Sequence, residues 1–387
     1  MVKVKNLYFS DKKWFISVIF LFYFLFLYWS FVYFFPRKSF KAAENVEHNT
    51  YHQVHIIGKA AIGQYLWSHL FNGSLDIIDK GFFQNGNKTI DNIIFTYYSG
   101  PGYIQNSIPQ EIQFLVLIIN GRTFKHVLKA KEWLDFLPEI HSLKKTAIIL
   151  LGNEKCENHW ILPYMKSKGG IIDILFIVYD SALIDNKEIF QWPLGVATYR
   201  GFPNLYYNQI KRVSSPRKYK CNFMGTVYKN SSREVVDASI RTSRLKNICY
   251  LSTRYKWLPN ESKESLAEYL SILQDSDFTL NPVGENTECY RIYEAAALGS
   301  IPIIEDNMTP GLCVSPLRLL KKFNPPFIFV KSWKTLHEVL QTDNFNFENI
   351  IEQRIKLLLW YDIFKKNIVT YFLNILKESF FSFTLSQ

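Results

Sequence analysis

Continuous apolar runs and segments with helical spacing alternate along most of this chain. In the first half, runs rich in Ile, Leu and Val occupy residues 114–119, 147–151 and 171–178. Such runs are typical of parallel strands that are covered on both faces. Residues 124–136, between the first two runs, have the spacing of a helix. This alternation predicts a doubly wound α/β sheet.

A second series of the same kind follows residues 211–220, a basic segment containing Ser214, Ser215 and Pro216 that we interpret as a linker. Strands are predicted at 221–224, 248–251, 278–280, 301–304 and 327–330, and helices at 232–244, 262–274 and 287–298. Residues 347–378 also have helical spacing and are expected to pack back against the first domain. The pattern therefore favours two Rossmann-like α/β domains.

An apolar run of a different kind precedes both series. Residues 14–35 are uncharged and rich in aromatic side chains, and as a helix they would span a hydrocarbon core of about 30 Å. The bulky residues Tyr33, Phe34 and Phe35 at the end of the run do not resemble a signal-peptide cleavage site. We therefore expect a retained transmembrane anchor. Basic residues occur on both sides of it, so charge only mildly favours a cytoplasmic N-terminus.

N-glycosylation triplets and all the cysteines follow this predicted anchor. The triplets begin at Asn72, Asn87, Asn230, Asn260 and Asn307. The cysteines are Cys156, Cys221, Cys249, Cys289 and Cys313, which would permit up to two disulfides with one thiol left over. Buried unpaired cysteines remain the default in a core of this size. Such triplets also arise by chance, but together they favour a luminal body.

The stretch from residue 277 to 306 has the layout of a phosphate-binding unit. It reads as a strand, a turn containing Gly284, a helix carrying Arg291 and Glu294, a stop at Gly299 and a second strand. The free N–H groups of a helix N-terminus bind phosphate, and Arg291 would add a cation. Glu294, on the same helix face, would accept hydrogen bonds from ribose hydroxyls. The alternative is an ordinary βαβ unit in which Arg291 and Glu294 form a surface ion pair.

The overall charge is compatible with an anionic ligand. The formal net charge is +11 and the isoelectric point is near 9.2, so positive potential would steer anionic substrates into a cleft. Many basic side chains simply solvate a surface, and lysines flanking the predicted anchor would also meet anionic lipid headgroups. Nucleic-acid binding is disfavoured because no recognition motif is present and the body is expected to face a lumen.

Part of this unit resembles the donor half of the exostosin-type glycosyltransferases. The resemblance rests on Phe278-x-Leu280-x-Pro282-x-Gly284, Arg291-x-Tyr293-Glu294-Ala295 and Gly299-Ser300-Ile301-Pro302. It implies a GT-B fold, in which two Rossmann-like domains face a cleft and the C-terminal domain binds a nucleotide sugar. It also implies that Arg291 contacts the diphosphate and Glu294 the ribose.

A longer resemblance covers nearly all of the chain after the anchor. The strings FQWPLGVATYR at 190–200 and NTECYRIYEA at 286–295, with shorter motifs at 120–122, 151–154, 179–181 and 221–223, are similar to the ribitol-phosphate xylosyltransferase family that acts on dystroglycan. Here the stem and the segment after Gly311 are shorter than expected for that family, and a trimmed loop there could alter acceptor contacts.

This second resemblance implies a type II Golgi membrane enzyme of the protein O-mannosylation pathway. Its expected activity is the inverting transfer of xylose from UDP-xylose to ribitol phosphate on the O-mannosyl glycan of dystroglycan, giving a β1,4 linkage. Other Golgi enzymes of the same pathway are expected partners. The donor-binding residues are expected to be Gly284, Asn286, Thr287, Tyr290, Arg291 and Glu294.

Together, the patterns and the resemblances divide the chain into six parts. We expect a cytoplasmic tail at 1–13, a transmembrane signal anchor at 14–35, a stem at 36–54, an acceptor-side Rossmann-like domain at 55–215, a nucleotide-sugar-binding Rossmann-like domain at 216–340 and a C-terminal helix at 341–387 that packs on the first domain. The predicted fold class is therefore α/β of GT-B type, preceded by a single transmembrane helix.

An inverting transfer requires a general base, expected from the first domain. Ligand-contacting residues lie just past the carboxyl ends of parallel strands. Asp180 follows the run at 171–178 and is the first candidate, and Glu154 follows the run at 147–151 and is the second. A helix cap or a loop hydrogen bond is the alternative for each, and His159 is a weaker candidate. Arg122 is expected to bind the acceptor phosphate, unless it forms a surface salt bridge.

Asp275-Ser276-Asp277 matches the Asp-x-Asp motif of metal-dependent glycosyltransferases. It precedes a predicted strand and so lies at the wrong edge of the sheet. We expect no metal and no cofactor, because Arg291 and the helix dipole would supply the positive charge.

Three hypotheses follow from the sequence. The first is a ribitol-phosphate xylosyltransferase, and the second is an exostosin-like enzyme that uses another UDP-sugar, such as glucuronate or N-acetylglucosamine. The third is a catalytically silent glycan-binding scaffold. The intact set of Gly284, Arg291 and Glu294 argues against the third.

Overall fold

The computed structural model describes residues 51–78, 82–256, 258, 262–341 and 346–381. The predicted transmembrane segment at 14–35 and most of the predicted stem lie outside these residues. Within the described part of the chain, no helix combines the length and the apolar character needed to cross a membrane. Two separate β-sheets flanked by helices make up the described residues, which confirms a mixed α/β fold of Rossmann-like character.

The first sheet has eight strands in the order β2-β3-β4-β1-β5-β6-β7-β8. Their bounds are β1 His52–Gly58, β2 Asp76–Ile78, β3 Phe83–Ile90, β4 Ile93–Ser99, β5 Phe114–Asn120, β6 Lys145–Leu151, β7 Ile174–Val178 and β8 Ile189–Trp192. The pairs from β4 through β1 to β8 are parallel, whereas β2, β3 and β4 form an antiparallel edge. Strands β5, β6 and β7 lie on the three predicted apolar runs.

The helix α3 (Phe124–Phe136) follows β5 on the predicted residues. Its start is fixed by the side chain of Thr123, which accepts a hydrogen bond from the backbone N–H of His126. This side-chain cap satisfies one of the free N–H groups at the helix N-terminus. Because α3 begins only a few residues after β5 ends, Arg122 and Thr123 lie at the carboxyl-terminal edge of the first sheet.

The second sheet is entirely parallel and has the order β10-β9-β11-β12-β13. Its strands are β9 Tyr219–Thr226, β10 Cys249–Arg254, β11 Ser276–Asn281, β12 Ile301–Glu305 and β13 Ile328–Val330. Its helices are α4 Ser232–Arg241, α5 Lys263–Gln274, α6 Tyr290–Ala297, α7 Arg318–Lys322 and α8 Leu336–Gln341. The strand order reverses between β9 and β11, and such a switch point creates a crevice at the carboxyl ends of the strands.

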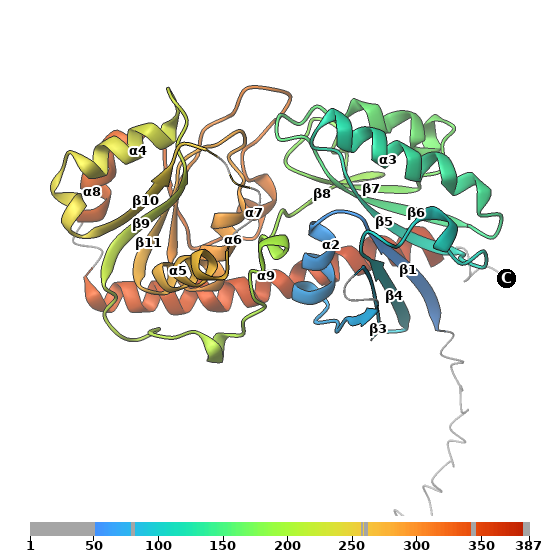
Figure 1. Cartoon of the computed structure of the whole chain (residues 1–387), viewed down its shortest axis with the longest axis horizontal. Helices are drawn as coiled ribbons and strands as arrows, with labels where there is room; N and C mark the ends of the chain where they lie inside the picture. The colour runs from blue at the N-terminus through green and yellow to red at the C-terminus, as the bar shows by residue number, and fades with distance from the viewer. Residues whose placement is uncertain (1–50, 79–81, 257, 259–261, 342–345, 382–387) are drawn as a thin grey trace, which may run out of the picture. The chain divides into compact units, whose positions relative to one another are not determined.

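The last helix, α9 (Phe347–Phe381), has 35 residues and packs along both sheets. Near its middle, the Phe364 ring lies 5.4 Å from Phe323, which belongs to the second half of the chain. Further on, the Phe372 ring lies 5.4 Å from Phe176 on β7 and 5.5 Å from Trp192 on β8. The predicted packing on the first domain is therefore present, but the helix also packs on the second domain (Figure 1).

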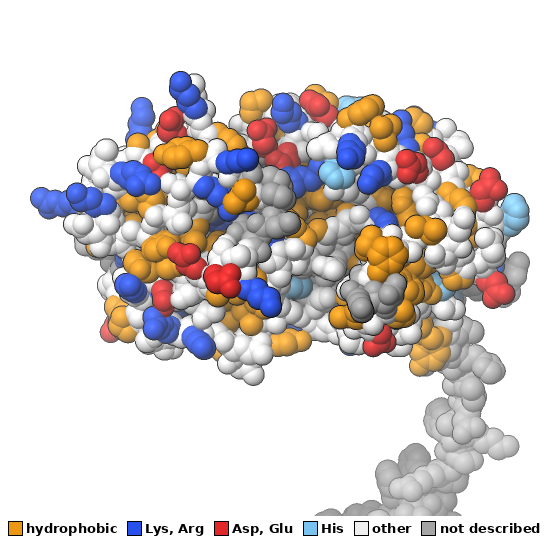
Figure 2. Space-filling view, viewed as in Figure 1, with side chains coloured by type: hydrophobic (Ala, Val, Ile, Leu, Met, Phe, Trp, Pro, Cys, Tyr) orange, Lys and Arg blue, Asp and Glu red, His pale blue; other side chains and the backbone are white. Residues whose placement is uncertain are grey.

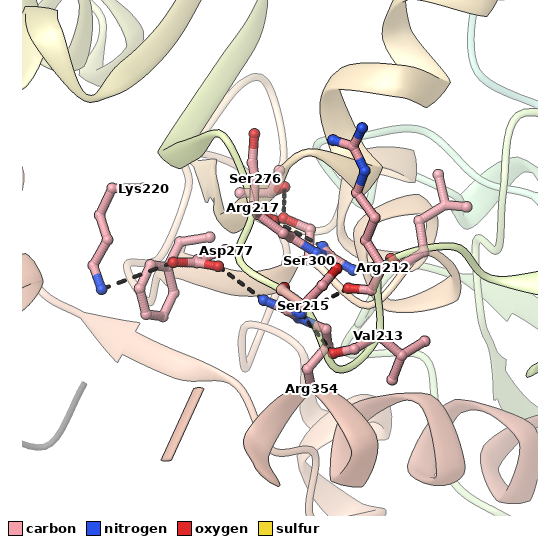
Figure 3. A network of polar contacts seen from close by, with 12 residues as sticks. Arg212, Val213, Ser215, Arg217, Lys220, Ser276, Asp277, Ser300 and Arg354 are labelled. Atoms are coloured by element: carbon pink, nitrogen blue, oxygen red, sulfur yellow. Dashed lines mark hydrogen bonds and ion pairs between the residues drawn. The ribbon is translucent and has the colours of Figure 1, made fainter. Parts of the chain in front are cut away.

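A buried arginine ties α9 to the segment between the two sheets. Arg354 is fully buried, and its Nη1 donates hydrogen bonds of 2.6–3.1 Å to the carbonyl oxygens of Arg212, Val213 and Ser215. Its Nη2 donates to Asp277 Oδ1 at 2.9 Å (Figure 3). Arg354 therefore holds the predicted linker through three of its carbonyl oxygens. Its ion pair with Asp277 joins the same site to the start of β11.

Four of the five cysteines are paired, contrary to the default expectation of unpaired buried thiols. Cys221 and Cys249 lie directly opposite each other on β9 and β10. Cys156 and Cys313 are 157 residues apart and join the loop after β6 to the loop after β12. The second bridge therefore links the two sheet-containing halves covalently. Cys289 is not disulfide-bonded.

Backbone hydrogen bonds reinforce this covalent link between the halves. The Leu312 N–H donates to the Lys155 carbonyl oxygen at 2.7 Å, and the Val314 N–H donates to the Asp180 carbonyl oxygen at 3.0 Å. Residues 312–315 therefore lie along the loops that follow β6 and β7, and they fix the far segment beside the carboxyl ends of the first sheet.

Candidate functional site

A cleft of about 1050 Å³ opens between the two sheets. Its first wall contains Asn120, the last residue of β5, together with Asn153 and Tyr179, which follow β6 and β7. Its second wall contains the ends of β9 and β10 and the loop that follows β11. Both walls are therefore built from the carboxyl ends of parallel strands, where α/β proteins bind ligands. The volume is at the upper end of the range for small-molecule sites.

Two arginines lie at the switch point of the second sheet. Arg291 on α6 donates from Nη2 to the Met224 carbonyl oxygen at 2.9 Å, and Arg233 on α4 donates from Nη1 to the Thr226 carbonyl oxygen at 3.0 Å. Nε and Nη1 of Arg291 and Nε of Arg233 are buried without a partner among the described residues. Unsatisfied guanidinium N–H groups in a cleft indicate a site for an anion with several oxygens.

Glycines allow these guanidinium groups to lie close to the backbone. A Cβ atom added at Gly225 would lie 2.7 Å from Arg291 Nη2, and one added at Gly284 would lie 2.3 Å from Arg233 Nη2. A larger residue at either position would push the arginine aside. The absence of a side chain at Gly284 therefore leaves room for the Arg233 guanidinium group. Contact between Gly284 and a ligand stays a prediction.

The electrostatic environment of the two arginines is strongly cationic. Burial, and then the neighbouring charge of Arg291, lower the pKa of Arg233. Arg291 lies over the Phe223 ring at 5.0 Å, and Arg233 lies over the Tyr228 ring at 5.8 Å. Contact with an aromatic face partly compensates each charge. An anion bound between the two would compensate both more fully. On the face drawn in Figure 2, Lys and Arg side chains are frequent over the second-sheet half.

Glu294 lines the same cleft but does not pair with Arg291. Its Oε1 accepts the Ala197 N–H at 3.0 Å, and its Oε2 accepts the Tyr269 hydroxyl at 2.6 Å. No ion pair joins Glu294 to Arg291 in the described residues, so the surface-pair alternative is wrong. Glu294 instead fixes the chain segment that crosses from the first half to the second. Its contact with a ribose stays a prediction.

Of the other predicted donor-binding residues, some line the cleft and one does not. Asn286 and Tyr290 line the cleft, and the Tyr290 ring lies edge-on to Tyr199 at 5.8 Å. Asn286 Nδ2 donates to the Glu154 carbonyl oxygen at 2.7 Å. Thr287 is buried outside the lining, and its hydroxyl donates to the Asn307 carbonyl oxygen at 2.6 Å. Thr287 therefore supports the loop and does not face the cleft.

Arg122 and Glu154 both line the first wall, where their side chains form an ion pair. About a third of the Arg122 side chain and a quarter of the Glu154 side chain are exposed. The salt-bridge alternative for Arg122 is therefore present in the structure. Because the pair remains open to the cleft, an anionic ligand would compete with Glu154 for the guanidinium group.

Asp180, the first candidate for the general base, does not line the cleft. Its side chain is buried, with Oδ2 accepting the Ser315 N–H at 2.8 Å and Oδ1 lying 2.5 Å from Arg318 Nη2. It thus holds the far segment already fixed by the Cys156–Cys313 bridge. This placement argues against Asp180 as the base, because its carboxylate has these partners and does not line the cleft; its catalytic role stays a prediction.

The Asp-x-Asp sequence lies at the amino-terminal end of β11, which begins at Ser276, and outside the cleft lining, as its place at the start of the predicted strand suggested. Asp275 is paired with Arg212, and Asp277 is paired with Arg354 at 2.9 Å and with Lys220 at 3.9 Å (Figure 3). Both carboxylates therefore serve the packing of the linker and α9.

The glycosylation triplets differ in accessibility. Asn72, Asn87 and Asn230 are exposed, whereas Asn307 donates its Nδ2 to Glu305 Oε1 and to the Lys331 carbonyl oxygen, both at 3.0 Å. Asn260 lies outside the described residues. The amide of Asn307 is therefore already committed to the fold.

Sequence reasoning missed Arg233. Arg233 is the second residue of the helix predicted at 232–244, which is the first helix after the strand predicted at 221–224. The sequence feature that could have identified Arg233 is its position in the first turn of a helix beside a switch point of the sheet. The same reasoning was applied to the residues of α6.

Comparisons with known proteins agree with this geometry. The described residues define an α/β protein with two Rossmann-like sheets and an anion-receptive cleft between them. Residues 54–193 match the family model described as RXYLT1 N-terminal domain, and residues 199–381 match the RXYLT1 C-terminal domain. The chain therefore belongs to the ribitol-5-phosphate xylosyltransferase 1 family.

Individual relatives support the same assignment. The chain is 43% identical over 342 residues to "Ribitol-5-phosphate xylosyltransferase 1" of Danio rerio, covering 86% of this chain and 79% of the relative. It is 43% identical over 339 residues to the Homo sapiens protein of the same name, covering 84% and 76%. Both matches extend over both sheets and the cleft.

Proposed function

We propose that this protein transfers xylose from UDP-xylose to ribitol phosphate. The observation that carries the proposal is the 43% identity, over most of both chains, to relatives named ribitol-5-phosphate xylosyltransferase 1. The cleft supports it independently. The guanidinium groups of Arg291 and Arg233 have unsatisfied N–H donors that suit a diphosphate, and the opposite wall has polar groups for a second substrate.

The arrangement of the two walls supports a GT-B type of glycosyltransferase. The donor binds the second sheet, with its diphosphate at Arg291 and Arg233 and its nucleoside toward the ends of β10 and α5. Ser252, Thr253 and Ser265 line that end of the cleft. Gly284, Asn286, Tyr290 and Glu294 complete the donor side.

The acceptor binds the first wall. Arg122 is the proposed phosphate ligand, because a guanidinium group that is open to the cleft can exchange its carboxylate partner for a phosphate. His126, near the N-terminus of α3, lies beside it, and the charge of Arg122 contributes to lowering the pKa of His126 after burial. A cationic surrounding of this kind favours a phosphate over a neutral sugar.

The proposed chemistry is a single displacement with inversion to a β1,4 linkage. The acceptor hydroxyl oxygen attacks C1 of xylose, the C1–O bond to the diphosphate breaks, and UDP leaves with the electron pair. Arg291 and Arg233 stabilise the charge that develops on the diphosphate. The two guanidinium groups can provide this stabilisation without a divalent metal ion.

We further propose a type II membrane protein of the Golgi, acting on the O-mannosyl glycan of dystroglycan beside other enzymes of that pathway. Two disulfides support an oxidising compartment. The exposed triplets at Asn72, Asn87 and Asn230 support a luminal body. The predicted anchor at 14–35 supplies the membrane attachment.

A donor screen with the full chain in detergent tests the function. With a phosphoribitol acceptor, we expect UDP release from UDP-xylose that depends on the acceptor. Turnover with UDP-glucuronate or UDP-N-acetylglucosamine in its place would favour another exostosin-like activity. UDP binding without turnover of any donor would favour the glycan-binding scaffold.

A further inference from the structure

Glu288 lies on the floor of the cleft, just before α6, and is only 6% exposed. Its Oε1 accepts two hydrogen bonds, from the Leu194 N–H at 2.9 Å and from the Tyr293 hydroxyl at 2.5 Å. One donor belongs to the segment that crosses between the halves and the other to α6. The carboxylate is therefore held in one orientation at the junction of the two walls.

The second oxygen of Glu288 is free for a substrate. Oε2 makes no hydrogen bond within the described residues, yet it is not among the buried polar atoms that lack a partner. Oε2 therefore keeps some exposed surface, in a residue that lines the cleft. The other carboxylates considered above differ, because both oxygens of Glu294 accept hydrogen bonds, Asp180 is outside the lining and Glu154 is paired with Arg122.

We propose that Glu288 is the general base of the reaction; this rests on the proposed xylosyl transfer. Its Oε2 accepts the proton of the attacking acceptor hydroxyl while the new bond from that oxygen to C1 of xylose forms. The bond from C1 to the diphosphate oxygen breaks, UDP keeps the electron pair, and the proton on Glu288 later passes to solvent. The base thus belongs to the second wall, in the loop between β11 and α6, whereas the sequence predicted a base from the first domain.

The surroundings give Glu288 a basicity that suits this task. Burial raises its pKa to about 7, the hydrogen bonds from Tyr293 and Leu194 oppose the rise, and the charge of Asp180 adds to it. Tyr65 and Tyr179 are the other titratable groups that face it, and burial raises the pKa of each further above its ordinary value, so both hydroxyls stay protonated. A base with a pKa near the working pH is favourable for proton transfer.

Glu288→Gln is the primary test because the amide oxygen can still accept the Leu194 N–H. In the full chain, we expect kcat for xylosyl transfer to fall about 100-fold or more, while UDP affinity measured by calorimetry stays within about twofold. The acidic limb of the wild-type pH profile, near pH 7, should be absent from the variant. Glu157→Gln is the control, because Glu157 is an exposed carboxylate that lines the same cleft.

Tyr293→Phe tests the assignment by a shift of the pH limb. The Tyr293 hydroxyl lowers the pKa of Glu288, so its removal should move the acidic limb to higher pH. A carboxylate with only a structural role would leave the limb where it is.

The pH dependence of the melting temperature reports the titration of Glu288 independently of any activity assay. Burial raises the folded-state pKa of Glu288 from its ordinary value of 4.5 to about 7, so protonation stabilises the fold. This contribution is present below about pH 4.5 and is lost as the pH rises through about 7. The melting temperature of the wild type should therefore fall relative to Glu288→Gln across that window.

The outcomes separate the two proposals. A Glu288→Gln variant that keeps wild-type kcat, or that keeps the acidic limb, overturns the assignment of Glu288 and leaves the xylosyl transfer standing. A wild-type chain that binds UDP but transfers no xylose to phosphoribitol overturns both.

Discussion

The two walls of the cleft differ in whether their charged side chains already have partners. On the second sheet, Arg291 and Arg233 retain buried N–H donors without partners. On the first sheet, Arg122 is paired with Glu154, and Asp180 beside that wall is paired with Arg318. The second wall is therefore prepared for an anion before it arrives, whereas the first must exchange an existing partner.

This contrast suggests how the substrates divide the cleft. Unsatisfied buried donors favour a ligand that supplies many oxygens, such as a diphosphate. A salt bridge that is partly exposed contributes little stability, so it can be exchanged at low cost. We infer that the second wall supplies most of the donor affinity and the first wall supplies acceptor specificity.

The largest expected effect concerns the bridge that holds the walls together. In the chain-entropy view, closing 157 residues through Cys156–Cys313 stabilises the fold by about 5 kcal/mol, and closing 28 through Cys221–Cys249 by about 3.6 kcal/mol. Replacing both Cys156 and Cys313 by Ser should therefore lower the urea midpoint of unfolding more than replacing both Cys221 and Cys249. Activity should also fall only in the first, because its loops border the cleft. A larger loss of stability and activity on removing Cys221–Cys249 would contradict the claim that Cys156–Cys313 holds the two walls together.

Asp180→Asn tests whether that residue is a clamp or a base. Loss of the charged partner of Arg318 should lower the free energy of unfolding by about 1–3 kcal/mol. We expect kcat at a temperature where the variant is folded to stay within about twofold of the wild type. A folded variant whose kcat falls by about 100-fold would restore Asp180 as the candidate base.

Arg122→Ala tests the exchange proposed for the first wall. We expect the KM for the phosphoribitol acceptor to rise by about tenfold, equivalent to about 1.4 kcal/mol. The free energy of unfolding should change by less than about 1 kcal/mol, because the lost pair is partly exposed. Steady-state kinetics with each substrate varied in turn makes the measurement. A rise confined to the KM for UDP-xylose would place Arg122 on the donor side instead.

The smallest expected effect is that of a chelator. Since we propose that Arg291 and Arg233 stabilise the diphosphate, EDTA is expected to change the rate of transfer by less than about twofold. Loss of turnover in EDTA that manganese restores would show that the second wall needs a metal ion.

The sequence predicted the regular parts of the fold well. The helix at 124–136 has the predicted bounds because Thr123 caps it and apolar positions define its inner face. The antiparallel edge was missed, since β3 is mostly polar and only partly buried along its length. Helix α6 begins at Tyr290 rather than 287, because Glu288 and the residues before it form a loop.

The site was predicted less completely, because its geometry depends on residues far apart in the chain. Arg291 was found from its own strand-turn-helix unit, but no local pattern shows that Arg233 lies beside it. Asp180 has the correct position after a strand, and only the structure reveals that Arg318 and Ser315 occupy it. Glu288 was included only within a family motif, since its burial and its free oxygen are tertiary properties.

The affinity for UDP tests the prepared donor wall most directly. Calorimetry on the full chain should show binding weakened roughly 10- to 150-fold by Arg291→Ala and by Arg233→Ala, the equivalent of losing a hydrogen bond to a charged group. Arg244→Ala, an exposed arginine outside the cleft lining, should leave the affinity unchanged. Wild-type UDP affinity in both cleft variants would contradict the account.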